Sequence, residues 1–348
     1  MNKQATIKDI AKRLNISTST VSRALRNAPD VKAETRIKIL SLSEELKYQP
    51  NKLALSLQQN QTNTIGVIVP NLDHVLSLMV RGIDEVALEA GYTVMVCQSN
   101  ESFGREMVNT RRLMNSLVDG FIISVTSETK VFDHFKKILE QDIPLVAFDR
   151  VSTDLSAPRV VLDNKDGGFQ ATEHLIQQGY KRIAILAGPS NLAISNHRLE
   201  GYLSAIKKYK IKPDSQLIIH CDFNQEYAYN ATRDLLQMKR RPDAIFAISD
   251  RMAIGAMQAI KDAGLTMPHD IGLVGFNNDP VVNLVTPGIS SVDQPAFELG
   301  KTAAKLFLER LHNDNNMGNT EIVLKPRLII RESSTKTKSL HQKLSKGK

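Results

Sequence analysis

A short stretch near the N-terminus concentrates side chains that can bind phosphates and the edges of bases. Residues 15–27, NISTSTVSRALRN, hold five hydroxyl side chains and two arginines. Hydroxyls at the start of a helix can lie close to phosphates, because backbone N–H groups and the helix dipole favour anions there. An arginine on such a helix can reach O6 and N7 of guanine together. Helix capping is the alternative, but one cap needs one hydroxyl and not five, so we favour nucleic-acid recognition.

No arrangement typical of catalysis accompanies this stretch. The sequence has no GxxxxGK[ST], GxSxG, HExxH or GxGxxG motif, and no spacing singles out a nucleophile with its base. Gly167 and Gly168 open a predicted helix and indicate a turn rather than a phosphate-binding loop. Cys97 and Cys221 lie far apart without metal-ligand spacing, which suits a reducing cytoplasm. We therefore expect no enzyme activity, no cofactor and no metal.

Charge is distributed unevenly along the 348 residues. Residues 1–63 hold eleven Lys and Arg against five Asp and Glu, and residues 336–348 hold five Lys and no acid. The segment between them carries 29 basic and 32 acidic residues, so the net charge of +8 comes from the two ends. A short basic head on a nearly neutral body is typical of a polyanion-binding module attached to another domain. For the tail we expect a disordered segment, and we expect no signal peptide and no membrane span.

The first fifty residues predict the helices that would hold the polar stretch. Thr6 and Asp9 have the spacing of a capping box at the start of a first helix. Asn15 can end that helix in the left-handed conformation, and Ser17 can cap a second helix directly after it. The apolar residues that share one face are Ile7, Ile10, Ala11 and Leu14 on the first helix, and Val21, Ala24 and Leu25 on the second. Two short helices joined by so tight a turn make a helix-turn-helix.

A third helix is predicted over residues 33–46, where Ile37, Leu40 and their neighbours would close a small core. Because the apolar face of the second helix points to this core, its opposite face must point to solvent. That face carries Thr18, Ser19, Ser22 and Arg23.

Residues 50–62, PNKLALSLQQNQT, are a candidate interdomain helix. Such a short helix is marginal on its own in water, and its apolar residues cannot all be buried in one small domain. Two interpretations remain open. The segment is an ordinary linker with a packed helix, or it is a hinge helix that orders only on DNA beside the same helix of a second subunit.

Two blocks of alternating strands and helices follow from residue 64 onward. The short apolar runs lie at 64–70, 92–99, 119–125 and 143–149 in the first block, and at 181–188, 216–223, 243–250 and 270–277 in the second. Amphipathic stretches separate them, which is typical of parallel sheets covered by helices. We therefore expect two doubly wound α/β lobes. Ligands of such folds bind at the carboxyl ends of the strands, here in the cleft between the lobes.

Polar residues stand at these strand ends. The candidates are Asn71, Asp73, Ser124, Asp149, Arg150, Arg198, Phe223, Asp250, Asn277 and Gln294. Carboxylates, amides, arginines and an aromatic ring suit a small polyhydroxylated or carboxylated ligand. The alternative is that these are ordinary loop residues, because loops after buried strands are polar in most α/β proteins.

The sequence resembles the lactose-repressor (LacI/GalR) family of bacterial transcription factors. The resemblance rests on ATIKDIAKRLNISTSTVSRAL, on YQPNKLALSLQQNQTNTIGVIVPN, and on similarity that continues to KPRLIIRESS near residue 334. It implies a small all-α helix-turn-helix head on a core like that of periplasmic sugar-binding proteins. It puts Thr18, Ser19 and Arg23 at base-reading positions. The remaining DNA-binding residues expected in the head are Thr6, Ser17, Thr20, Ser22, Asn27 and Tyr48.

In the linker, the resemblance favours the hinge helix. Leu57 would then insert into the minor groove at the operator centre and kink the duplex, and Asn51 and Ala54 occupy hinge positions. Leu55 departs from the family, because many relatives carry Arg or Gln there.

In the cleft, the resemblance favours Arg198, Asp250 and Asn277 as effector contacts, although Asn277 stands where Asp is commoner. The chain also lacks an Asn-Pro-Phe-Phe-like segment whose aromatic rings line the pocket in many relatives. Its counterpart, LDHVLSL at 72–78, has no aromatic ring, which weakens the case for sugar stacking.

These features together predict a cytoplasmic transcription regulator, a repressor by family habit. It would bind a palindromic operator as a homodimer and respond to a small-molecule effector, a sugar or related metabolite. The alternatives are a transport-type solute-binding protein, which would need an export signal that residues 1–30 lack, and a small-molecule enzyme with a fused head. The effector, the operator, the direction of the response and the choice between dimer and tetramer stay open.

The expected domain boundaries follow from the same patterns. They are a head at 1–49, a hinge at 50–62, a two-lobed core at 63–335 and a tail at 336–348. Within the core, the first lobe takes residues 63–162 and a later crossover near 292–325, and the second takes 163–291 and the end.

Overall fold

The computed structural model describes residues 5–48, 61–312, 318 and 320–336. The chain divides into two compact units, Met1–Thr62 and Asn63–Lys348. Most of the predicted hinge lies outside the described residues, and with it Asn51, Ala54 and Leu57. The predicted tail beyond Lys336 lies outside them as well.

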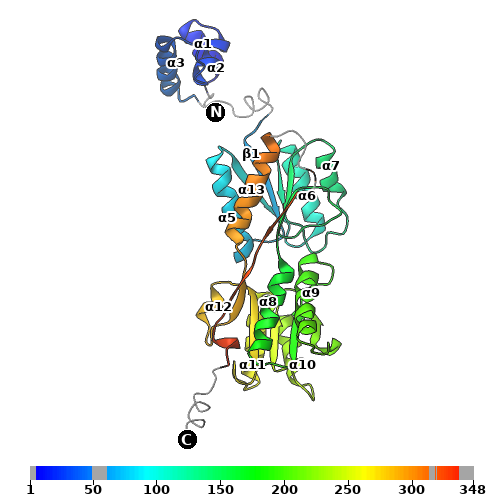
Figure 1. The fold of residues 1–348 in the computed structure, drawn as a ribbon. Coiled ribbons are helices and arrows are strands. Elements are labelled where there is room, and N and C mark those ends of the chain that lie inside the picture. The colour runs from blue at the N-terminus through cyan, green and yellow to red at the C-terminus, as the bar shows by residue number, and fades with distance from the viewer. Residues whose placement is uncertain (1–4, 49–60, 313–317, 319, 337–348) are drawn as a thin grey trace. The chain divides into compact units, whose positions relative to one another are not determined.

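The first unit is a helix-turn-helix against which a third helix packs. Its helices are α1 (Ile7–Leu14), α2 (Thr18–Leu25) and α3 (Ala33–Glu45) (Figure 1). The ends of α1 form as predicted, because the Asp9 carboxylate accepts the backbone N–H of Thr6 at 2.8 Å and Asn15 has a left-handed φ of 51°. The core consists of Ile10, Ala11, Val21, Ala24, Val31 and Ile39.

The prediction that α3 closes this core is wrong for the two residues it named, Ile37 and Leu40. These residues are 67% and 44% exposed, whereas their neighbour Ile39 is fully buried in the core. Successive residues of a helix are about 100° apart, so Ile37 points about 200° away from Ile39. The face of α3 that meets α1 and α2 continues from Ile39 through Ser43, which is also buried. The sequence places several apolar residues around α3, so apolar character alone could not identify the inner face.

The second unit contains two six-stranded sheets. In the N-lobe the strand order is β11 (Glu321–Leu324), β5 (Arg159–Leu162), β4 (Leu145–Phe148), β3 (Gly120–Ile123), β1 (Thr64–Val69) and β2 (Thr93–Gln98). In the C-lobe it is β12 (Arg327–Ile329), β10 (Ser290–Asp293), β9 (Gly272–Asn277), β8 (Ala244–Ala247), β6 (Ile183–Ala187) and β7 (Ile218–His220). All neighbouring strands are parallel except β10 and β12. The carboxyl ends of the parallel strands therefore share one edge in each lobe.

Helices cover both faces of the N-lobe sheet. They are α5 (His74–Glu89) and α13 (Ala296–His312) on one face, and α6 (Phe103–Asn115) and α7 (Asp133–Leu139) on the other (Figure 1). Glycines let α5 and α13 come very close, since a Cβ at Gly300 would lie 1.9 Å from the carbonyl oxygen of Met79. No helix in the described ranges is both long and apolar enough to cross a bilayer.

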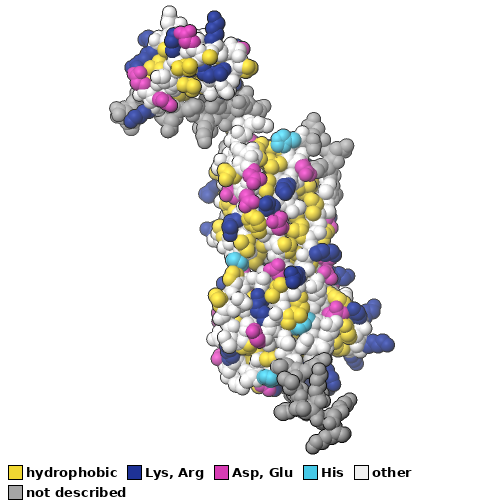
Figure 2. All heavy atoms as spheres, turned by 60° about the vertical axis from the view of Figure 1, so that its left-hand side comes forward, with side chains coloured by type: hydrophobic (Ala, Val, Ile, Leu, Met, Phe, Trp, Pro, Cys, Tyr) yellow, Lys and Arg dark blue, Asp and Glu magenta, His cyan; other side chains and the backbone are white. Residues whose placement is uncertain are grey.

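The C-lobe sheet is enclosed in the same manner. Its helices are α8 (Asn164–Gln177), α9 (Ala193–Lys208), α10 (Gln225–Leu236), α11 (Asp250–Asp262) and the short α12 (Val281–Leu284). Single 3-10 turns lie at Ser215–Leu217 and Glu332–Ser334. Basic and acidic side chains are interspersed on the face of the body in Figure 2, in keeping with its nearly neutral composition.

The chain crosses between the two lobes three times. It passes from β5 to α8, from β10 to α13 and from β11 to β12. Two of these crossings are tied together, because Lys325 Nζ lies 2.7 Å from the Asp163 carboxylate. Connections at one side of two lobes leave the other side free to open, which is the geometry of a hinged cleft.

Candidate DNA-reading helix and inter-lobe cleft

Three of the five clustered hydroxyls form the cap of α2. Ser17 Oγ accepts the backbone N–H of Thr20 at 3.1 Å, as predicted for an N-cap. It also lies 2.7 Å from Ser19 Oγ and 2.8 Å from Thr20 Oγ1. The cap therefore involves three hydroxyls, whereas the sequence predicted one. Thr18 remains exposed at the first position of the helix.

The outward face of α2 is the predicted one. Thr18, Ser19 and Arg23 are exposed and Ser22 is half-buried, while Val21 and Ala24 are buried in the core. The helix thus presents two hydroxyls and a guanidinium to solvent from its N-terminal and last turns. These are the donor groups that bind phosphates and guanine edges.

Three other predicted DNA-binding residues have local structural roles. The hydroxyl of exposed Thr6 lies 2.7 Å from the Asp9 carboxylate at the start of α1. Asn27 has a left-handed φ of 58° directly after α2. Tyr48 is half-buried and packs against the core, and burial raises the pKa of its hydroxyl. Nothing in these contacts prevents the exposed parts of these side chains from meeting DNA.

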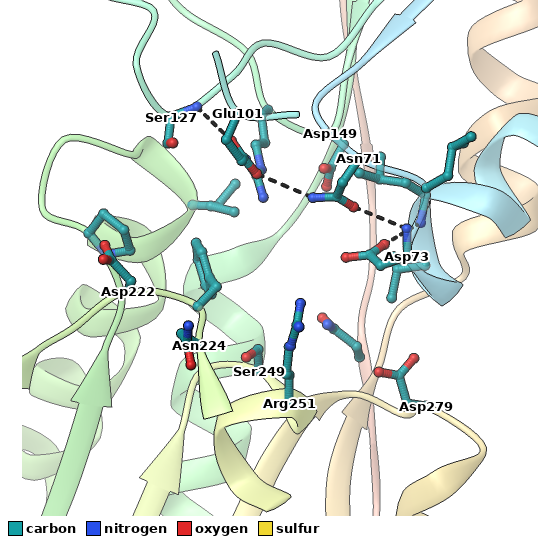
Figure 3. A pocket seen from close by; sticks show the side chains of 18 of the residues that line it. Asn71, Asp73, Glu101, Ser127, Asp149, Asp222, Asn224, Ser249, Arg251 and Asp279 are labelled. Atoms are coloured by element: carbon teal, nitrogen blue, oxygen red, sulfur yellow. Dashed lines mark hydrogen bonds and ion pairs between the residues drawn. The ribbon is translucent and has the colours of Figure 1, made fainter. Parts of the chain in front are cut away.

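A cavity of about 760 Å³ lies between the two lobes of the second unit. Figure 3 shows Asn71, Glu101 and Asp149 reaching in from the N-lobe, and Arg251 pointing into the cavity from the C-lobe. Of the ten residues predicted for the cleft, the lining includes Asn71, Asp73, Asp149, Arg150, Arg198, Phe223, Asn277 and Gln294. Its volume suits a small molecule.

Ser124 and Asp250 do not line this cavity. Ser124 is fully buried, and its hydroxyl accepts the backbone N–H of Arg150 at 3.4 Å. Asp250 is also fully buried; its carboxylate accepts the hydroxyl of Ser291 and the backbone N–H of Asp279, both at 2.7 Å. Both side chains point behind the cavity wall and hold the loops that form it. The prediction that they contact an effector directly therefore finds no support in this geometry.

Burial raises the pKa of Asp250 from an ordinary 3.8 to about 7. Between about pH 4 and pH 7 this carboxyl is protonated in the folded state and ionised in the unfolded state. The free energy of unfolding therefore decreases as the pH rises through this range. We expect the Asp250→Asn variant to lack this dependence. Over that range its thermal midpoint should therefore rise relative to that of the original protein, and the difference should level off above about pH 7. A difference that stays constant from about pH 4 to pH 8 would contradict this assignment.

A buried arginine forms the floor of the cleft. Arg198 is 3% exposed, donates to Asn164 Oδ1 at 2.8 Å and to the carbonyl oxygen of Ile248 at 2.6 Å, and stacks 3.7 Å from the centre of the Phe276 ring. Burial lowers its pKa to about 9, so it stays charged near neutral pH. Burial also raises the pKa of neighbouring Asp149, and this effect exceeds the lowering by the positive charges of Arg150 and Arg198.

At the N-lobe wall of the cavity, an ion pair between Arg150 and Glu101 connects the loops. Arg150 Nη1 lies 2.8 and 2.9 Å from the two carboxylate oxygens of Glu101. Glu101 also accepts the backbone N–H of Ser127 at 2.9 Å and the Asn71 amide at 3.2 Å (Figure 3). Burial alone would raise the pKa of Glu101, but Arg150 and the Ser127 hydrogen bonds lower it overall. The Arg150 guanidinium lies 5.6 Å from the Phe223 ring of the C-lobe.

Two residues of the cavity lining have buried acceptor atoms that lack a donor. Asp279 Oδ1 and Gln294 Oε1 are buried and have no hydrogen-bond partner among the described residues. Both residues line the cavity, and buried acceptors of this kind are costly when they stay unpaired. The protein encloses both atoms, so a ligand in the cavity does not reach them in this arrangement.

Four charged lining residues were not predicted from the sequence: Glu101, Asp222, Arg251 and Asp279. Asp222 directly precedes the predicted Phe223. Glu101 follows β2 by three positions, and Arg251 and Asp279 follow predicted residues by one and two positions. Their charged character next to strand ends was the available signal. In the described part of the chain no group of three or more His, Cys, Asp and Glu is placed to hold a metal ion.

Comparisons with known proteins agree with both units. The profile of "Bacterial regulatory proteins, lacI family" matches residues 6–51, and that of "Periplasmic binding protein-like domain" matches residues 172–334. The HTH-type transcriptional repressor CytR of Escherichia coli (strain K12) is 32% identical over 331 residues, which are 95% of this chain and 96% of that protein. The ribose operon repressor of Haemophilus influenzae is 32% identical over 332 residues, 94% of this chain and 98% of that protein.

Solved structures show the same architecture. The lac repressor dimer bound to operator and the anti-inducer ONPF superposes with a TM-score of 0.86 at 26% identity, and the match covers 96% of this chain and all of that one. The complex of the transcriptional regulator CelR with cellobiose gives a TM-score of 0.71 at 27% identity, over 94% of this chain and 99% of that one. The resemblance to the lactose-repressor family is thereby confirmed. The chain belongs to the LacI family of bacterial regulatory proteins, and it is a DNA-binding transcriptional regulator rather than an enzyme.

Proposed function

We propose that a dimer of this chain represses transcription in the cytoplasm by binding a palindromic operator, and that a small polar metabolite in the cleft changes its affinity for DNA. Two heads related by a two-fold axis match the two halves of a palindrome. The names of its relatives, which include a ribose operon repressor and a lac repressor dimer bound to operator, support this proposal.

The DNA-binding part of the proposal concerns the exposed face of α2. Arg23 would read a guanine, Thr18 and Ser19 would contact bases, and Ser22 would contact the backbone. The expected contributions of Thr6, Ser17, Thr20, Asn27, Tyr48, Asn51, Ala54 and Leu57 remain proposals of the same kind. Phosphate contacts fix the register of the head, while base contacts provide the sequence preference.

The effector part of the proposal rests on one observation, the cavity between the two lobes. Three crossings of the chain connect these lobes. A ligand that contacts both walls binds more tightly when the lobes approach, so it biases the angle between them. Arg198 and Phe223 would contact it from the C-lobe, and Asn71 and Asp149 from the N-lobe. A change in lobe angle would be transmitted to the first strand of the N-lobe and so to the hinge.

The cavity wall favours a neutral or amino-bearing polyol over a strong anion. Five lining residues are acidic, Asp73, Glu101, Asp149, Asp222 and Asp279, and three are arginines, Arg150, Arg198 and Arg251. A sugar or a nucleoside satisfies such a wall through its hydroxyl groups.

Thermal unfolding in the presence of candidate effectors tests the effector part. The panel contains pentoses, hexoses, their acids and nucleosides, each added to the full chain. A compound present at about a hundred times its Kd stabilises the protein by roughly 2.7 kcal/mol, which raises the thermal midpoint by several degrees. We expect at least one neutral polyol or nucleoside to do so. If the sugar acids alone shift the midpoint, the proposed ligand class is wrong.

A further inference from the structure

Asp30 stands beside the arginine that we propose reads the operator. Arg23 lies in the last turn of α2 and forms an ion pair with Asp30, in the turn between α2 and α3. Their side chains are 53% and 45% exposed. Exposed ion pairs contribute little to folding stability. The ion pair therefore acts mainly on the position of the Arg23 guanidinium.

The turn that carries Asp30 is fixed to the end of α2 by backbone hydrogen bonds. Asn27 adopts a left-handed φ of 58°, and its N–H donates to the carbonyl oxygen of Ala24 at 3.0 Å. The N–H of Ala28 donates to the carbonyl oxygen of Arg23 at 2.9 Å. This pair of bonds around a left-handed residue is a common way to end a helix, and it turns the chain back beside Arg23.

The other side of the turn is fixed to the core. Val31, the residue after Asp30, is buried with 9% exposure. The Arg36 guanidinium of α3 donates to the carbonyl oxygens of Ala28 and Val31. Asp30 therefore stands on a backbone that is anchored before and after it.

We propose that Asp30 is a specificity-determining residue, which holds the Arg23 guanidinium in the orientation that reads a base. The proposal rests on the operator function proposed above. Asp30 engages Nη2 of Arg23, whose second N–H remains with the adjacent N–H of Nε or Nη1 as a pair of donors for a guanine edge. An arginine held in place loses less side-chain entropy when it binds a base. The carboxylate also repels phosphates of any sequence, so it lowers overall affinity while it increases discrimination.

The test uses the full chain and a random-sequence library of DNA duplexes. Selection with the original protein yields a preferred duplex, and Arg23→Ala identifies the base pair whose preference depends on Arg23. Asp30→Asn should reduce discrimination at that base pair by about five- to tenfold. It should also raise affinity for an unrelated duplex by about threefold at low salt. In the Arg23→Ala background it should not change discrimination further.

Glu34→Gln is the matched control. Glu34 is an exposed acid on α3 that pairs with Lys38 at 2.8 Å, so the variant removes the same charge at another place in the head. Its discrimination should equal that of the original protein. Asp30→Glu keeps the charge, and should retain most of the discrimination that Asp30→Asn loses, even if both variants unfold at a lower temperature.

Two results would overturn the proposal. One is an equal gain in affinity for every duplex with Asp30→Asn, because then the charge alone matters. The other is the same loss of discrimination with Asp30→Glu and Asp30→Asn at matched folded fractions. If the original protein selects no sequence at all, the operator function itself fails, and the Asp30 proposal fails with it.

Discussion

Replacement of Arg23 by alanine is expected to lower affinity for the preferred operator by about ten- to a hundredfold. One bidentate contact between an arginine and a guanine discriminates against the wrong base by roughly 1–3 kcal/mol. Arg23 is exposed on α2, so its loss should not disturb the buried core of the head. Affinity for random DNA should fall by less than about threefold, because a single positive charge has been removed. Titration of both duplexes at one salt concentration measures the two effects.

Arg13→Ala provides the control for loss of charge. Arg13 lies on α1 and pairs with Glu45 at 3.0 Å, and it is as exposed as Arg23. Its replacement should weaken binding to all sequences by a similar, small factor. If Arg13→Ala and Arg23→Ala lower operator affinity equally and leave the sequence preference intact, Arg23 is not a base-reading residue.

The second large effect is expected for Arg198→Met. The variant removes hydrogen bonds to Asn164 and to the carbonyl oxygen of Ile248 and leaves both acceptors buried, at a cost of about 1–3 kcal/mol each. It also removes the cation that we expect to contact the effector. The affinity for the stabilising compound should fall by more than about a hundredfold, while the operator is still bound. Thermal shift and operator titration on one preparation measure both properties.

Arg182→Met separates this effect from general destabilisation. Arg182 also lies in the C-lobe, pairs with Asp214 at 2.7 Å and donates to the carbonyl oxygen of Arg240 at 2.8 Å. It is not part of the cleft lining. Its replacement should lower the thermal midpoint and leave the shift caused by the effector unchanged. A similar loss of effector response in both variants would show that Arg198 acts only through stability.

The long apolar runs made most strands predictable. Each of the eight predicted runs contains a strand. Six of these strands are buried, and a strand buried on both faces needs apolar residues in succession. The other two, β2 and β7, lie at sheet edges and are exposed or half-buried. Four strands, β5, β10, β11 and β12, were not predicted from the sequence, and each has three or four residues. In β10, SSVD, the hydroxyl of buried Ser290 bonds to Ser334 of a 3-10 turn, and that of buried Ser291 bonds to Asp250 at the start of α11. Polar residues therefore occur inside the sheet. Periodicity could not reveal such a strand.

The sequence predicted where the cleft lies but not which side chains line it. Parallel topology brings strand ends to one edge, and this principle located six of the eight candidates that line the cavity. The other two are Arg198, which lies within α9, and Gln294, which follows the unpredicted strand β10. The principle could not tell Asp250 from Arg251, which are neighbours at the start of α11. One points behind the wall and the other into the cavity (Figure 3). Helix rotation of about 100° per residue separates them, and only the three-dimensional arrangement fixes which residue faces inward.

Binding of a small molecule in the cleft is expected to change the affinity of the head for a palindromic operator. The most direct test of this expectation is a titration of the selected duplex with the full chain, with and without the compound that raises the thermal midpoint. Coupling between two sites is typically 1–3 kcal/mol, so we predict that the compound changes the Kd for the duplex by about five- to a hundredfold and leaves the Kd for random DNA unchanged. An identical Kd for the selected duplex at saturating compound would contradict the account.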